Sequence, residues 1–205
     1  VNTTNYAAFL TLKQNLFSRL IFSAGLRLDH NNYENINLWS PRINLDYEIY
    51  KGKTNFIINA GLYNQNPPPI YIANEASNDL KSVSAYQHSL SLEHMVTPST
   101  KLSFSAYQKK YTNSPILPGA TLHNDPTFLF DELRMYNGIV SSGSAISDGL
   151  EILIQKKKAE KFYGLVGGSI FNSTFTDYNG IKRNRNHNYR YIFNIVGGYR
   201  PNTDW

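Results

Sequence analysis

Strict alternation of apolar and polar residues is the feature that most limits how this chain can fold. Within residues 40–65, the first alternating stretch sets Ile43, Leu45, Tyr47 and Ile49 against Arg42, Asn44, Asp46 and Glu48. Successive side chains of a strand point to opposite faces, so one face of this stretch is apolar and the other is polar. A short polar turn at residues 51–53 leads to a second alternating stretch, residues 55–62. The pattern predicts a hairpin of two long strands.

The same period of two recurs along the whole chain and predicts about nine strands. Besides the hairpin, they lie near residues 6–13, 20–28, 86–95, 101–111, 149–155, 162–171 and 189–199. In the clearest of them, Leu150, Ile152 and Ile154 face away from Glu151 and Gln155. No helix is predicted beyond a short turn around residues 128–135. The predicted fold class is therefore all-β.

Short and long connections alternate between these strands. The short ones lie around Asn15 and at residues 51–53, 97–99 and 159–160, whereas the long ones are rich in Asn, Pro, Gly and Ser. In an antiparallel up-and-down meander, this alternation puts tight turns at one rim and long loops at the other. Outer-membrane barrels have this asymmetry, with strands of about ten residues. The sequence therefore predicts a transmembrane β-barrel segment.

A soluble β-sandwich also alternates apolar and polar residues, but its strands average about five or six residues and its loops need not segregate by length. The mean hydropathy of −0.41 is compatible with a membrane barrel, because it averages lipid-facing and lumen-facing residues. The absence of cysteine excludes disulfides and thiolate metal sites. The net charge of +5 is dispersed, which favours a solvated surface over nucleic-acid binding.

An odd number of strands places the two ends of the segment at opposite rims. Such a segment cannot close on itself as a simple antiparallel barrel, and an open edge in lipid would leave backbone groups without hydrogen-bond partners. Residues 1–205 are therefore expected to form part of one larger outer-membrane β-barrel domain.

Signatures of catalysis are missing from the sequence, which contains no GxSxG, HExxH, GxGxxG or P-loop motif. The five histidines show no metal-binding spacing: His30, His88, His94, His123 and His187. A barrel lipase would need a Ser, His and carboxyl or amide set near the outer rim, and no spacing singles one out. The DYNG sequence at residues 177–180 lacks the other oxygen ligands of a calcium loop and is read as a turn. We expect neither an enzyme nor a cofactor.

Two sets of residues are candidate binding surfaces. The first is a lumen wall formed by Arg27, Arg42, Asp46, Glu48, Glu93, Lys109, Glu151 and Gln155. This wall is expected to form ion pairs with a plug and water, in preference to direct substrate contacts. The second set lies in the long loops 64–84 and 112–147 and comprises Tyr71, His123, Phe128 and Phe130. Loops of this length are usually functional or mobile, so we expect these to be extracellular, mobile and able to capture a ligand.

Several stretches resemble the barrel of TonB-dependent receptors in their order and spacing. They are GLRLDHNNYENINLWSPRINLDYEI, NAGLYNQNPPP, LSFSAYQKKYTNSPI, SDGLEILIQKK and GGYRPNTDW, which together span nearly the whole chain. The resemblance implies a barrel of about 22 strands that is occluded by an N-terminal plug domain. It also implies import of scarce nutrients with energy passed through TonB. No plug domain or TonB-contacting box is matched in this chain.

The expected function is therefore that of a barrel segment in a TonB-dependent receptor of a Gram-negative outer membrane. The expected partners are outer-membrane lipid, a plug domain and TonB through the rest of the receptor, and a small-molecule, peptide or glycan ligand. A surface lipoprotein that caps the barrel is a further partner to consider, whereas nucleic acid is not expected. The alternatives are a passive porin or structural outer-membrane protein, and a soluble all-β adhesin.

Overall fold

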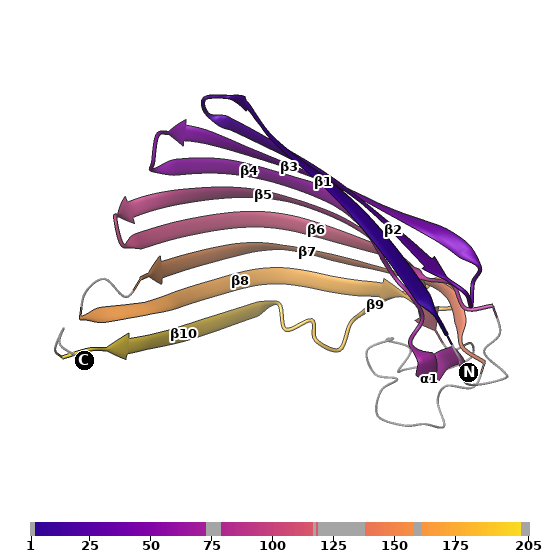
Figure 1. Ribbon diagram of the computed structural model, residues 1–205. Coiled ribbons are helices and arrows are strands. Elements are labelled where there is room, and N and C mark those ends of the chain that lie inside the picture. The colour runs from indigo at the N-terminus through magenta and orange to yellow at the C-terminus, as the bar shows by residue number, and fades with distance from the viewer. Residues whose placement is uncertain (1–2, 73–78, 117, 119–137, 158–160, 202–205) are drawn as a thin grey trace.

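The computed structural model describes residues 3–72, 79–116, 118, 138–157 and 161–201. These residues form one antiparallel sheet of ten strands and one short helix (Figure 1). The strands are β1 (Asn5–Phe17), β2 (Leu20–Asn31), β3 (Ile36–Tyr50), β4 (Thr54–Gln65), β5 (Val83–Thr97), β6 (Thr100–Ile116), β7 (Val140–Lys156), β8 (Phe162–Thr176), β9 (Lys182–Asn184) and β10 (Tyr191–Tyr199), and the helix is α1 (Pro69–Ile72).

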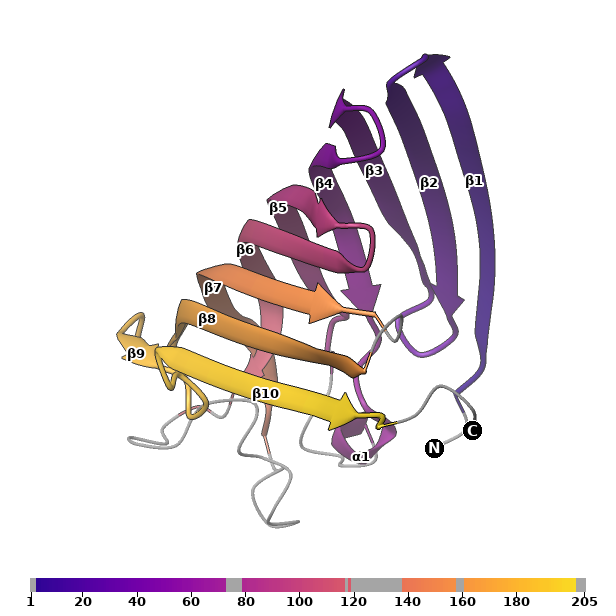
Figure 2. The ribbon, with the colours of Figure 1, turned by 90° about the vertical axis from the view of Figure 1, so that its left-hand side faces the viewer.

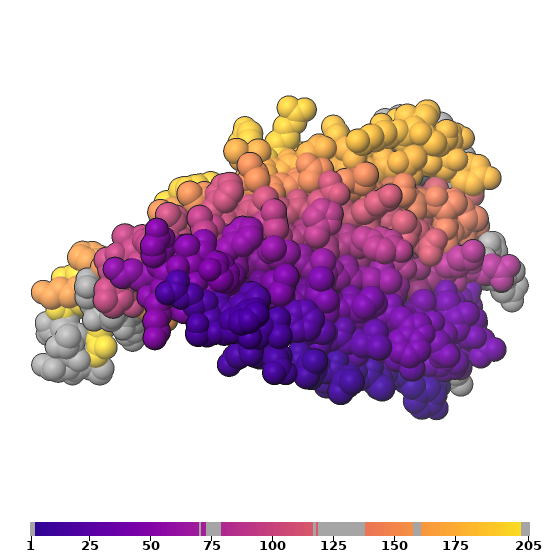
Figure 3. Space-filling model, turned by 90° about the horizontal axis from the view of Figure 1, so that it is seen from above, coloured from indigo at the N-terminus to yellow at the C-terminus, as the bar shows by residue number. Residues whose placement is uncertain are grey.

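Neighbouring strands in the sheet are neighbours in the sequence. The order runs from β1 to β8 and then to β10, while the short β9 pairs with the end of β8. The sheet is strongly curved, like a section of a barrel wall, with β1 and β10 as its two edges (Figure 2). A space-filling view shows the strands following one another in chain order across the surface (Figure 3). The predicted all-β, up-and-down segment of a larger barrel is confirmed, and the segment is unclosed.

Most of the observed strands are longer than the predicted ones, and the sheet has one strand more than predicted. β10 is shorter, since it covers Tyr191–Tyr199 and the prediction covered 189–199. β7 covers 17 residues because its small and polar first half, Val140–Asp148, pairs with β6 although it shows no apolar alternation. The first turn lies at residues 18–19 and not around Asn15, because β1 continues to Phe17. Strand β9 and helix α1 were not expected. The predicted turn at residues 128–135 and the predicted short connection at 159–160 lie outside the described residues.

Strand register separates the side chains into an apolar and a polar face. One row of paired residues across β3 to β8 consists of Leu45, Ile58, Leu90, Ala106, Leu150 and Ile170. The adjacent row, one residue along each strand, consists of Asn44, Asn59, Ser89, Tyr107, Gly149 and Phe171. The two rows point to opposite sides of the sheet because their residues are neighbours in each strand.

The apolar face is the outer, convex face. Along β5, Leu90 and Leu92 are 48% and 42% exposed. The residues that alternate with them, Ser89, Ser91 and Glu93, are half-buried. Curvature spreads side chains apart on the convex side and crowds them on the concave side. Few apolar side chains are buried between protein elements in the described part of the chain, so an apolar solvent such as lipid must cover this face. No helix among the described residues is long and apolar enough to cross a membrane.

The outer apolar belt runs diagonally across the strands. Ala24 on β2 is paired with Ile43 on β3, and the same register row continues through Ala60 on β4 to Gln108 on β6 and Asp148 on β7. The row is therefore apolar at one end of the sheet and charged at the other. Strands that are tilted from the bilayer normal produce this change of polarity along a row. A register row is perpendicular to the strands, so it crosses the bilayer obliquely.

Candidate functional site

The eight residues expected on the lumen wall share the polar face of the sheet. Register pairs seven of them with polar or small residues: Arg27 with Ser40, Arg42 with Gly61, Glu48 with Asn55, Glu93 with Ser103, Lys109 with Ser147, Glu151 with Ser105 and Gln155 with Lys101. The eighth, Asp46, is paired with the apolar Ile57. The eight residues are spread over this face and do not form a single cluster. Their contact with a plug or a ligand remains a prediction.

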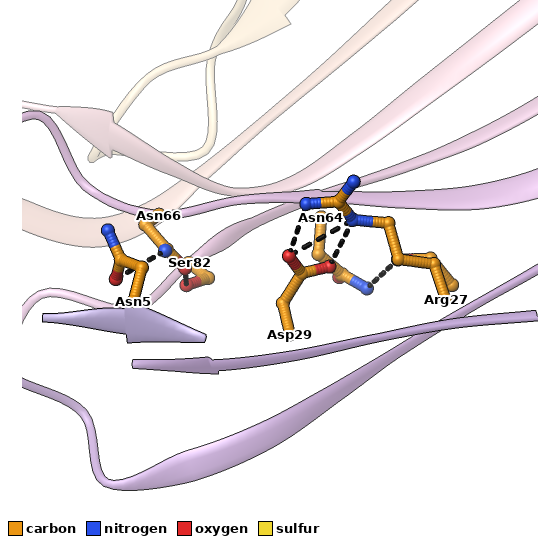
Figure 4. Close-up of polar contacts among 7 residues, drawn as sticks. Asn5, Arg27, Asp29, Asn64, Asn66 and Ser82 are labelled. Carbon is orange, nitrogen blue, oxygen red and sulfur yellow. Dashed lines mark hydrogen bonds and ion pairs between the residues drawn. The ribbon is translucent and has the colours of Figure 1, made fainter. Parts of the chain in front are cut away.

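Several of these side chains are held by partners within the sheet. The Arg27 guanidinium donates three hydrogen bonds to the Asp29 carboxylate, two from Nε and one from Nη2, with an ion-pair distance of 2.7 Å (Figure 4). Lys101 Nζ lies 2.9 Å from Glu93 Oε1. The sequence reasoning missed both partners, although an acid two residues after a base on one strand was an available signal for the first pair. Both pairs are partly exposed, so each contributes little to stability.

Two acids of the set support local structure. Glu48 Oε1 accepts a hydrogen bond of 2.6 Å from the backbone N–H of Gly52, whose positive φ of 68° shapes the tight β3–β4 turn. Asp46 Oδ1 accepts a hydrogen bond of 2.8 Å from Asn55 Nδ2 on the neighbouring strand. These contacts leave part of each carboxylate for other partners.

A polar hollow of about 410 Å³ lies on the concave face over β4 to β7. Its lining includes Asn59, Tyr63, Gln87, Ser89, Ser91, Ser105, Tyr107, Lys109 and Glu151. Asn44 Nδ2 donates to Asn59 Oδ1 at 2.6 Å, and the hydroxyls of Ser91 and Ser105 lie 2.9 Å apart. The hollow therefore offers amide and hydroxyl groups on a floor of small side chains, with Lys109 and Glu151 as its charges.

A hydrogen-bond network around Ser82 ties the long-loop segments together. Ser82 is 2% exposed, and its backbone N–H donates to Glu34 Oε1 at 2.7 Å. Its hydroxyl contacts the other oxygen of Glu34, and Asn66 Oδ1 lies 3.1 Å from the same hydroxyl. Asn66 in turn donates to Asn5 Oδ1 at 3.1 Å, which extends the network to β1 (Figure 4). Glu34 and Ser82 are 48 residues apart, so no local sequence pattern could have paired them.

Beside this network, three long-loop segments share a small apolar cluster. Tyr71, Leu80 and Ile139 are each at most 2% exposed, and Tyr33 packs against them. Tyr33 Oη also accepts a hydrogen bond of 3.3 Å from the backbone N–H of Leu80. Tyr71 was expected to offer its ring to a ligand, whereas here it lies inside the cluster. The expectation that the loop from 64 to 84 is mobile does not fit residues 66–72 and 79–82, which these contacts anchor.

A hollow of about 760 Å³ adjoins the network at the long-loop rim. It is lined by Tyr33, Glu34, Ile36, Leu38, Asp79, Leu80, Lys81, Ser82, Ser84 and Asn113. Asn113 donates from Nδ2 to Ser82 O at 3.2 Å, so the backbone of one wall is fixed to β6. The lining combines apolar, aromatic and charged groups. The other loop candidates, His123, Phe128 and Phe130, lie outside the described residues.

The loop after β8 is organised by one carboxylate, that of Asp177, which is 5% exposed. Asp177 Oδ1 accepts hydrogen bonds from the backbone N–H groups of Asn179 and Ile181 at 3.0 and 2.9 Å. Asp177 Oδ2 lies 2.7 Å from Arg183 Nε. The hydrogen bond from Arg183 lowers the pKa of Asp177 below its ordinary value, and the backbone donors act in the same direction. The turn at Asn179 and Gly180 is confirmed, and no group of metal ligands occurs among the described residues.

We expect acid to loosen this turn. Because the pKa of Asp177 is lowered in the folded state, its stabilising effect is present above the ordinary carboxyl pKa of about 4 and is lost as the pH falls through the folded value. Hydrogen exchange at the amides of Asn179 and Ile181, corrected for intrinsic rates, should therefore accelerate in acid. Asp177→Asn should remove the pH dependence, whereas Asp177→Ala should remove protection at every pH. Unchanged pH dependence in Asp177→Asn would contradict the assignment.

The two-faced, curved sheet has the architecture of a section of a transmembrane β-barrel wall. The chain belongs to the TonB-dependent receptor β-barrel family, because the family model described as "TonB dependent receptor-like, beta-barrel" matches residues 1–205. This family consists of receptors and transporters of the Gram-negative outer membrane. Membership favours the predicted receptor barrel over a passive porin or a soluble adhesin.

Solved structures of receptors share the fold. The ferric-catecholate import receptor Fiu of Escherichia coli superposes with a TM-score of 0.70 at 12% identity, covering 98% of this chain and 33% of Fiu. The alcaligin receptor FauA of Bordetella pertussis gives 0.65 at 19% identity, with coverages of 98% and 35%. The ferric enterobactin receptor PfeA of Pseudomonas aeruginosa gives 0.61 at 13%, with 98% and 38%. The chain thus spans about a third of the length of these receptors. Among curated protein sequences, none matches it.

Proposed function

We propose that this chain forms part of the barrel of an outer-membrane receptor that captures a scarce nutrient and imports it with energy supplied through TonB. Residues 1–205 would contribute to one barrel domain, and the plug would come from another part of the receptor. The role is one of binding and transport without catalysis. Family membership supports this proposal, and so does the division of the wall into a lipid-compatible face and a hydrogen-bonding face.

The observation that carries the proposal is the hollow at the long-loop rim. Its wall is fixed by the buried contact of Ser82 with Glu34, and two of its lining residues, Ile36 and Leu38, belong to the polar face by register. A ligand held there would contact the loops and the entrance to the lumen together. Tyr33, Ile36 and Leu38 provide apolar surface, while Lys81 and Asn113 provide hydrogen-bond donors. The lining also includes the carboxylates of Glu34 and Asp79. It therefore suits a ligand that combines ring or aliphatic surface with polar groups that both donate and accept hydrogen bonds.

Ferric siderophores are the ligand class to test first. Fiu is a ferric-catecholate receptor, FauA an alcaligin receptor and PfeA a ferric enterobactin receptor. Charges on the concave face, such as Arg42 and Lys109, are proposed to contact the plug and the passing ligand. Peptide or glycan cargo and a capping surface lipoprotein are the further possibilities for the same rim.

Filling the rim hollow should block capture. Leu38→Trp, made in the full-length receptor, adds a large ring to the lining and should lower uptake of radioactive iron by at least about tenfold, which corresponds to about 1.4 kcal/mol of binding free energy. Ferric enterobactin and ferric alcaligin are the first probes, and the amount of receptor in the outer membrane is measured in parallel. Asn37→Trp is the matched control, because Asn37 directly precedes Leu38 on β3 and therefore faces the other side of the sheet.

Loss of uptake in Leu38→Trp with normal uptake in Asn37→Trp supports capture at the hollow. Equal uptake by both variants and the unmodified receptor, for a siderophore that the receptor transports, would show that the hollow is not the capture site. Diffusion of the same solute without TonB would contradict active import.

A further inference from the structure

The backbone pairing of β3 with β4 stops short of the long-loop rim. It runs from their tight turn as far as Arg42 and Gly61, although β3 begins at Ile36 and β4 ends at Gln65. Residues 36–41 stay paired with β2, and residues 62–65 stay paired with β5, so the two strands diverge beyond this point (Figure 2). We call the stretch where residues 36–41 and 62–65 form no pairs with each other the seam.

Pro41 explains why the pairing ends where it does. The backbone N–H of Glu48 donates to Arg19 O, on the β2 side of β3. Backbone groups of a strand point alternately to its two neighbours, so the even-numbered N–H groups of β3 point toward β2 and the odd-numbered ones toward β4. Position 41 is therefore one that should donate to β4, and proline has no N–H to donate. The pairing with β2 is unaffected, because Pro41 is paired there with Leu26.

The side chain of Asn64 takes the place of the missing backbone pairing. Its Nδ2 lies 3.0 Å from both Trp39 O and Ser40 Oγ, across the seam on β3. Its Oδ1 accepts a hydrogen bond of 2.7 Å from Ser84 Oγ on β5. Trp39 is odd-numbered, so its carbonyl is one that the pairing with β4 would otherwise have used. The amide of Asn64 therefore clips the two strands together.

The other hydrogen bonds across the seam also come from side chains. We call the rim-proximal parts of β1, β2 and β3, with the loop between β2 and β3, the β3 side. Those of β4, β5 and β6, with the loop between β4 and β5, are the β4 side. The bonds that join the two sides are Asn66 to Asn5, Ser82 to Glu34 and Leu80 N–H to Tyr33 Oη. Within each side, backbone pairing continues past the level at which the seam begins.

This difference makes the seam the place where the wall can open. A side-chain hydrogen bond is released by a change of rotamer, whereas a strand pair separates only when several backbone bonds break together. The seam also borders the hollow of about 760 Å³ at the long-loop rim. Ile36 and Leu38 line it from the β3 side, and Lys81 and Asn113 line it from the β4 side. The separation of the two sides therefore sets the width of the hollow.

We propose that the seam is a hinged opening of the barrel wall, which starts at Pro41 and is held shut by Asn64 and Glu34. Release of these two side chains lets the β3 side and the β4 side move apart and widens the rim hollow. Their re-formation narrows the hollow again around its contents. The inference rests on the proposed function in one respect, which is that the rim hollow is the place of ligand capture.

The test measures the width of the hollow directly in the full-length receptor in detergent. Nitroxide labels on Ile36→Cys and Lys81→Cys report the distance between its two sides by pulsed electron resonance. Combining Asn64→Ala with Glu34→Ala should lengthen the mean label distance by about 5 Å, one spacing between strands, and broaden its distribution. Labels on Lys81→Cys and Lys110→Cys, both on the β4 side, should keep their distance, which shows that this side remains folded.

Asn59→Ala is the matched control. Asn59 also belongs to β4, and its Oδ1 accepts a hydrogen bond of 2.6 Å from Asn44 Nδ2 on β3, but there the backbones are paired. This substitution should leave the distance between the labels at positions 36 and 81 unchanged. An unchanged distance without Asn64 and Glu34, or an equal lengthening in Asn59→Ala, would overturn the proposal. The distances are measured without ligand, so this proposal and the import proposal can fail separately.

Discussion

Replacing Ile152 with Arg should destabilise the barrel by about 2 to 4 kcal/mol, the cost of a cationic side chain near the middle of the lipid-facing belt. Ile152 is 49% exposed on the convex face and lies between Phe104 and Gly168 in the register. Leu150 and Ile154 flank it on the same face with similar exposure. In lipid, all of this exposed area contacts acyl chains, which cannot solvate a guanidinium. Denaturant unfolding of the full-length receptor in lipid vesicles measures the loss.

Gln155→Arg is the comparison for this substitution. Gln155 lies three residues away on β7, pairs with Lys101 and Leu165, and belongs to the polar face. An arginine there can reach water in the lumen, so the free energy of unfolding should change little. Equal destabilisation by the two substitutions would mean that the faces have been assigned wrongly.

Adding one methyl group at Gly164 should disrupt the junction of β8 with β10. A Cβ at this position would lie 2.5 Å from the carbonyl oxygen of Val196 and 2.9 Å from the Cα of Gly197. Both contacts are with backbone, which cannot move aside without breaking the pairing of Gly164 with Gly197. Overpacking of this kind costs about 1 to 3 kcal/mol. Gly164→Ala should lower the free energy of unfolding by that amount in the same vesicle assay.

Gly168 offers a control on the same strand and the same face. A Cβ at Gly168 would lie 3.6 Å from the nearest atom, a methyl of Ile152, which is an ordinary contact. Gly168→Ala should therefore be neutral or slightly stabilising, since alanine restricts the unfolded chain more than glycine does. If Gly168→Ala is as damaging as Gly164→Ala, the loss would reflect general strand flexibility and not the close approach of the two backbones.

The alternation of side chains was enough to predict the membrane-embedded part of the fold. Leu150, Ile152 and Ile154 have the predicted common face because period-two geometry leaves no other choice once the strand exists. The ends of the strands could not be predicted in this way. Residues 140–148 pair through their backbone outside the apolar belt, where either face can be polar, so they carry no alternating pattern.

The candidate sites were less accessible to sequence reasoning. Parity alone places Arg27 and Lys109 on the polar face, but the partners of these side chains depend on strand register. The rim network joins Glu34 to Ser82 and packs Tyr71 against Ile139, and these contacts arise from loops that meet only after the sheet has formed. An aromatic residue in a long loop can equally face solvent or fill such a junction. Burial of Tyr71 is therefore a property of the assembled loops.

The tight turns of one rim also influence the order in which this wall can assemble. Strands β1 and β2 are separated by residues 18–19, and β5 and β6 by residues 98–99, whereas residues 117–139 separate β6 from β7. Closing the longer connection costs about 2 kcal/mol more in chain entropy. Hairpins joined by tight turns can therefore form early as local units, while β6 and β7 must meet by a slower search. The wall is thus a series of preformed hairpins whose long connections are organised last, when contacts such as that of Ser82 with Glu34 become available.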